Sequence, residues 1–114
     1  MSFFDSEVVR AEMSEITELQ EEIYQNVFKF SSMSKEEKLE HVAVLQKLLD
    51  KQKILYTRLS LSDDEEAKQM KKRVRDSAIM MGLPPNVDMN VIFNNMTRVI
   101  EVMKERIDLT GSDL

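Results

Sequence analysis

The sequence predicts an all-α protein, and three observations carry that prediction. Apolar side chains recur at helical spacing along most of the 114 residues. Only two Gly and two Pro interrupt the chain, which favours long helices joined by short turns. Apolar residues make up 42% of the composition, enough for the core of a single domain. We expect a four-helix antiparallel bundle, or an extended helical hairpin plus a shorter helix pair, with helices at about 5–30, 35–60, 63–81 and 87–107.

The first two helices are predicted from an apolar stripe and from a cap. Over residues 5–30, a stripe repeats every seven residues at Val9, Ile16, Ile23 and Phe30, and the remaining surface is acidic. Ser2 or Ser6 can cap the start of this helix. Ser34 and Glu37 have the spacing of a capping box and predict the start of the helix over 35–60.

The last two helices have clear start and stop signals. Ser62 and Glu65 again have capping-box spacing, and acids follow in the expected first turn. Gly82 is placed to end this helix in a left-handed conformation. Asn86 or Asp88 can cap the fourth helix, and residues 108–114 are predicted to form a polar tail.

The third predicted helix carries a cluster of five bases, Lys68, Lys71, Lys72, Arg73 and Arg75. The cluster is a solvated helix surface, a docking face for an acidic partner, or a stripe that binds nucleic acid. The third interpretation has two points against it. The net charge of −5 repels phosphate on average, and the cluster contains no aromatic platform for stacking bases.

The composition offers little for catalysis. There is no Cys, and the single His41 is interpreted as a structural, partly exposed histidine. A di-iron bundle would need Glu-x-x-His pairs on two helices, and the chain has only one His. We therefore expect no metal and no other cofactor. With Gly only at 82 and 111, a glycine-rich phosphate loop cannot form. We therefore expect a protein that is not an enzyme.

Methionine and the N-terminal aromatics suggest contact surfaces. Six of the nine Met residues lie in the last two predicted helices, where they fill the core or line an adaptable groove. Exposure of both Met80 and Met81 beside Leu83 would favour the groove. Phe3 and Phe4 pack on the helices, or they form a free hydrophobic anchor for another protein.

Solubility and oligomeric state follow from pattern and length. No run of about 18 apolar residues exists, and the N-terminus lacks the basic and apolar segments of a secretory signal. We expect a cytoplasmic protein without a membrane partner. The long predicted helices cannot all be covered in one compact bundle of this size. We expect a homodimer, with a monomeric bundle with splayed ends as the alternative.

Three segments resemble a known family. They are "FFDSEVV" at 3–9, "LYTRLSLSDDEEAKQM" at 55–70 and "MGLPP" with "MNVIFNNMTRVIEVMKERI" in the last part of the chain. Together they resemble a small uncharacterised family, a domain of unknown function found mainly in cyanobacteria and in the phages that infect them. The resemblance implies a helical cytoplasmic protein, in the host cytoplasm if phage-encoded, and no activity. It also marks "LSDD" as a defined helix junction, where we expect Leu61 to fill the core.

We therefore expect a non-enzymatic adaptor or regulatory protein that binds an unidentified protein. Its predicted contact surfaces are the Phe3–Phe4 end, the basic helix and the turn with Met80, Met81 and Leu83. The alternative is a nucleic-acid-associated regulator that uses the basic third helix.

Overall fold

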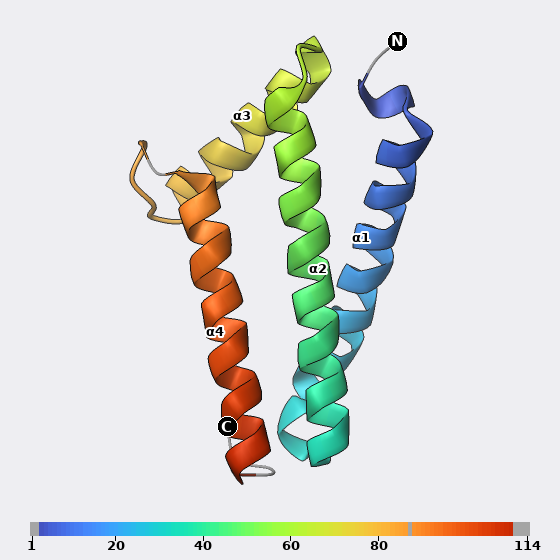
Figure 1. Ribbon diagram of the computed structural model, residues 1–114, viewed down its shortest axis with the longest axis vertical. Coiled ribbons are helices and arrows are strands. Elements are labelled where there is room, and N and C mark those ends of the chain that lie inside the picture. Colours follow the sequence, from blue (N-terminus) through green and yellow to red (C-terminus); the bar gives the residue numbers. More distant parts are fainter. Residues whose placement is uncertain (1–2, 87, 111–114) are drawn as a thin grey trace.

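The computed structural model describes residues 3–86 and 88–110, and within them the chain forms four α-helices and no strand (Figure 1). The all-α prediction is confirmed. The elements are η1 (Phe3–Asp5), α1 (Glu7–Asn26), η2 (Val27–Ser32), α2 (Lys35–Leu61), α3 (Glu65–Met80) and α4 (Met89–Thr110), where η marks a 3-10 helix.

The helix α2 is the centre of the fold. Figure 1 shows α1 on one side of it and α4 on the other, while α3 crosses from the end of α2 to the start of α4. The extents of the chain are 48 × 32 × 19 Å, so the three long helices form a thin layer. The predicted pairing of the last two helices is replaced by packing of α4 on α2, because the short α3 leaves α2 at a steep angle.

Three of the predicted caps are present. Ser34 and Glu37 form the predicted capping box, in which each side chain accepts a hydrogen bond from the backbone of the other residue. Ser6, one of two predicted caps for α1, accepts from the Val9 backbone at 3.5 Å. At the start of α4, Asp88 Oδ1 accepts from the Asn90 backbone at 2.9 Å.

The predicted capping box at Ser62 and Glu65 is absent. Ser62 is instead the C-cap of α2, directly after Leu61, and its hydroxyl accepts a hydrogen bond from the Asp64 backbone amide at 3.1 Å. Helix α3 therefore begins at Glu65, two residues later than predicted. The same continuation of α2 corrects the expectation for Leu61, which is 81% exposed. Leu59 faces the core, and two residues further along a helix the side chain points to the other side.

Other helix ends also differ from the predicted ranges. Helix α1 stops at Asn26, where the side-chain amide donates to the Glu22 carbonyl at 2.8 Å and competes with the backbone ladder. Helix α4 continues through residues 108–110, which had been assigned to the polar tail, while 111–114 lie outside the described residues.

Gly82 ends the α3 region as predicted, with a φ of 101°. The Leu83 and Gly82 amides donate to the Ala78 and Ile79 carbonyls, which is the Schellman pattern.

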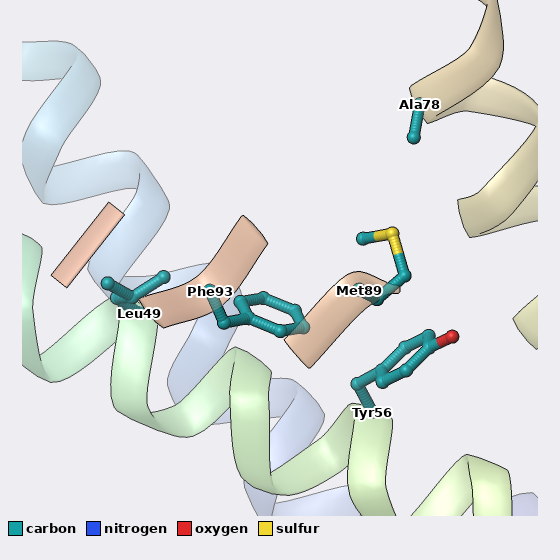
Figure 2. Close-up of a cluster of buried hydrophobic side chains, with 5 residues drawn as sticks. All are labelled: Leu49, Tyr56, Ala78, Met89 and Phe93. Atoms are coloured by element: carbon teal, nitrogen blue, oxygen red, sulfur yellow. The ribbon is translucent and has the colours of Figure 1, made fainter. Parts of the chain in front are cut away.

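The main core cluster joins α2, α3 and α4, and its members are Leu49, Tyr56, Ala78, Met89 and Phe93. The rings of Tyr56 and Phe93 lie 5.8 Å apart between centroids. Figure 2 shows Met89 between Tyr56 and Ala78, so this side chain fills the space where α3 crosses the layer. The cluster fixes the start of α4 against α2 and holds α3 over one end of both.

Replacement of Leu49 by Ala tests this core. Leu49 is 2% exposed, and its truncation should lower the free energy of unfolding by about 2–5 kcal/mol. Leu109→Ala is the matched control, because Leu109 is 85% exposed, and it should change stability by less than about 0.5 kcal/mol. Urea unfolding followed by circular dichroism, at one fixed protein concentration, measures both. Equal losses in the two variants would contradict the assigned core.

Candidate functional site

An open groove of about 810 Å³ lies on the described surface. Helix α2 forms its floor, α1 and α4 form its two walls, and α3 closes one end. Its lining residues are Phe4, Met13, Ile16, Gln20, Gln52, Leu55, Tyr56, Leu59, Met70, Val74, Ser77, Ala78, Met81, Leu83, Met89, Ile92, Phe93 and Met96.

The spacing of the lining residues explains why three helices face one groove. Along α1 the side chains that face it follow three-then-four steps at Met13, Ile16 and Gln20, and α2 has the same steps at Gln52, Leu55 and Leu59. In α4 the pattern runs through Ile92, Met96, Val99 and Met103. This is the heptad spacing of a helix that packs lengthwise against other helices.

The groove is chemically uniform. No charged side chain is among the lining residues within the described chain, and five of them are Met. Gln20 and Gln52 are half-buried, and neither side-chain amide is hydrogen bonded to a described residue. A surface of hydrocarbon, thioether and a few neutral polar groups can take up another apolar surface, and flexible Met side chains adapt to its shape.

Two of the three predicted contact surfaces open onto this groove. Phe4 and Leu83 are half-buried lining residues, and Met81 lies at the edge with 85% of its surface exposed. Met80 is 89% exposed, so both methionines of the turn are on the surface. Phe3 is half-buried and contacts Phe4 edge-to-face, with 5.1 Å between ring centroids.

One hydrogen bond holds the N-terminal aromatics at the end of the groove. The Phe3 backbone amide donates to Asp64 Oδ2 at 2.8 Å, which ties η1 to the junction between α2 and α3. Because Phe3 and Phe4 pack in this way, they are part of the fold in the isolated chain and not a free anchor. Asp64 of the "LSDD" junction therefore has a long-range partner in Phe3, and it is also the residue directly before the first turn of α3.

The predicted basic surface lies away from the groove lining. Lys68, Lys72 and Arg73 are exposed, whereas Lys71 and Arg75 are half-buried. Lys68, Lys71, Lys72 and Arg73 form no ion pair with any described residue. The structure thus leaves most of this cluster solvated.

Sequence reasoning missed the floor and the two long walls of the groove. Ile16, for example, is expected from the sequence only as part of the apolar stripe of the first helix. The signal that could have found them is the heptad spacing shared by three helices, which predicts a common seam. Which side of the layer stays open depends on where α3 crosses, and that position is set by the tertiary fold.

Two ion pairs join α1, the first wall of the groove, to α2, its floor. Glu15 and Lys51 are 2.8 Å apart, and Glu12 and Arg58 are 3.0 Å apart. The hydrogen bond and the charge of Lys51 lower the pKa of Glu15. Two acids of α1 thus pair with bases of α2.

A second, polar hollow of about 120 Å³ lies at the other end of α1 and α2. His41 borders it and is only 8% exposed, so the prediction of partial exposure is wrong. The Phe30 ring lies 5.3 Å from the His41 ring and 5.4 Å from the Lys38 ammonium, and Lys38 is 2% exposed. Burial lowers the pKa of His41, while the negative charge of Glu22 acts in the opposite direction.

Metal ligands and membrane spans were sought in the part of the chain that the structure describes. No cluster of three or more His, Asp or Glu side chains in these residues is arranged to hold a metal ion. None of the described helices combines the length and apolar character needed to cross a bilayer.

The fold and the groove define a small all-α protein whose described surface carries an open apolar groove without charged lining residues. The chain belongs to the family described as a domain of unknown function, DUF1825, which matches residues 1–107. The comparison with curated proteins found no match, and neither did the comparison with solved structures.

The buried His41 should make stability depend on pH. Its ordinary pKa is 6.5, and the folded protein holds it lower. Below about pH 6.5 the unfolded chain therefore binds more protons than the folded chain, and stability should fall as the pH decreases. His41→Gln should reduce this fall between about pH 7 and pH 5.5.

The urea midpoint at several pH values above 5 measures this effect in both proteins. Glu15 does not interfere, because its lowered pKa gives stability that is present above its ordinary 4.5 and is lost only at more acidic pH. Identical pH slopes for the two proteins would contradict the assignment to His41.

Proposed function

We propose that this protein is a non-enzymatic protein-binding module and that its groove takes up an amphipathic helix. The observation that carries the proposal is an open groove of about 810 Å³ without a charged lining residue among the described residues. A contiguous apolar surface that a soluble protein leaves open often marks a site of interaction.

A helix is the occupant that the lining favours. The walls and floor are helices, and the side chains that face the groove follow heptad spacing. Such a surface offers the holes into which apolar side chains of a further helix insert. A partner helix would present apolar side chains at the same spacing.

The chemistry of the lining supports binding over catalysis. Apart from hydrocarbon and thioether groups, the side chains offer two amides, the Ser77 hydroxyl and the Tyr56 phenol. Neither hydroxyl has a carboxylate, imidazole or amine beside it within the groove lining. Activation of a nucleophile requires such a base.

The proposal includes a regulatory or adaptor role in the cytoplasm. The motif resemblance supports a cyanobacterial or cyanophage origin, so a cyanobacterial lysate is the appropriate source of partners.

Photo-crosslinking tests the groove as a protein-binding site. A benzophenone amino acid at position 96, in the groove wall, should form covalent adducts with a protein in the lysate. The same group at position 91 is the matched control, because Val91 is 51% and Met96 46% exposed on the same helix. Adducts at 96 and few at 91 are expected, and mass spectrometry identifies them. A groove that gives no more protein adducts than the control would contradict the proposal.

Nucleic-acid binding through α3 is the second candidate, and one observation favours it. Lys68, Lys72 and Arg73 are exposed and form no ion pair with a described residue. The net charge of −5 opposes it.

We expect no retention of this protein on DNA or RNA even at about 50 mM salt, where phosphate contacts are strongest. Fluorescence anisotropy with labelled oligonucleotides measures this. Binding that weakens steeply with salt, and that is lost in a Lys71→Glu, Lys72→Glu, Arg73→Glu triple variant, would instead establish the second candidate.

A further inference from the structure

We infer that the occupant of the groove is a second copy of this chain, so that two thin layers stack face to face around a two-fold axis. This inference rests on the proposed function, because it names the partner of the same groove. It places the heptad seam of α4 from each copy in the groove of the other.

The surface of the single chain indicates how much a partner should cover. The chain exposes 8007 Å². A compact folded monomer of 13.3 kDa exposes about 6,450 Å². The excess of about 1,500 Å² falls within the range of about 1,000–2,500 Å² that each subunit buries in an obligate homodimer.

The shape of the chain leads to the same conclusion. Its radius of gyration is 16.2 Å. A compact domain of 114 residues has about 13 Å. The shortest extent, 19 Å, is far below the other two, at 48 and 32 Å. A second layer on the open face would bring the three dimensions closer together and would cover the groove on both copies at once.

The apolar seam continues past the groove along α4. Val99 is 59% exposed and Met103 is half-buried, and they follow Ile92 and Met96 at four-then-three spacing. The positions that flank this seam, Asn95 and Val102, carry no charge. Charged flanking residues are the usual means by which a helix selects a different partner. The uncharged seam has the composition typical of the centre of a homodimer interface.

The absence of charge from the described groove lining and the seam also suits a symmetric dimer. In a two-fold dimer each residue of the patch meets a residue of the same patch, so the patch must complement itself. An uncharged surface meets this condition without like-charge repulsion. The acids of α1 that lie nearest to α2 are already paired with Lys51 and Arg58 in the same chain, so they need no partner from a second copy.

Substitution within the seam tests the inference. Met96→Glu places a carboxylate in the proposed interface, and Val91→Glu places the same group on another face of α4 at similar exposure. Sedimentation velocity and light scattering at several concentrations should show a wild-type dimer. We expect Met96→Glu to raise the dissociation constant at least about 100-fold, because an unpaired charge would be buried on both copies. Val91→Glu should leave it within about threefold.

Folding of the variants is checked by circular dichroism, and Met96→Ala provides a second, milder variant that keeps the interface neutral. It should weaken the dimer less than Met96→Glu does. With the purified protein, the benzophenone at position 96 should give an adduct of twice the chain mass that maps to the groove of the other copy.

The outcomes separate this inference from the proposed function. A wild-type protein that stays monomeric at high concentration would overturn the second copy as occupant. So would a dimer that Met96→Glu does not weaken. In either case, a foreign protein captured from position 96 in the lysate would still support the groove as a protein-binding site. An absence of adducts in both experiments would remove both proposals.

Discussion

The structure depends on the position of α2, which must bury apolar side chains in more than two directions. Its neighbours α1 and α4 each cover one flank, and α3 is only 16 residues long, too short to cover a helix of 27. A single layer of three long helices therefore leaves part of α2 open. The groove is the direct consequence of this incomplete cover, and Gln52, Leu55 and Leu59 form its floor.

Small local interactions decide where that opening lies. The Schellman turn at Gly82 and the two prolines after it send the chain back towards α2, so α4 lies beside α2. Asp64 holds η1 against the junction of α2 and α3 through the Phe3 amide. The bridges from Lys51 and Arg58 hold α1 at the opposite wall. Each contact is modest in energy, but together they fix the distances between the elements that surround the groove.

Local signals in the sequence predicted the elements well and their arrangement in part. Ser34, Asp88 and Gly82 identify helix ends because their effects act within a few residues. The absent capping box at Ser62 shows the limit of such signals, since α2 continued through Leu61 and Asp64 found a partner 61 residues away. The groove could not be located from the sequence, because heptad spacing indicates that a helix face is apolar but does not indicate which element covers that face. Of the turn that was expected to be a contact surface, Met81 and Leu83 lie among the residues that line the groove.

Two amides in the groove bear on how such a surface distinguishes partners. A seam of Leu, Ile and Met alone would accept many registers, because hydrocarbon contacts are non-directional. Gln20 and Gln52 lie half-buried among apolar residues, each on a different helix, without a side-chain hydrogen bond to a described residue. An occupant that left them facing hydrocarbon would incur the cost of unsatisfied polar groups. The registers that remain favourable are those that bring a polar group opposite each amide, and in a symmetric pair the amides of the other copy provide one.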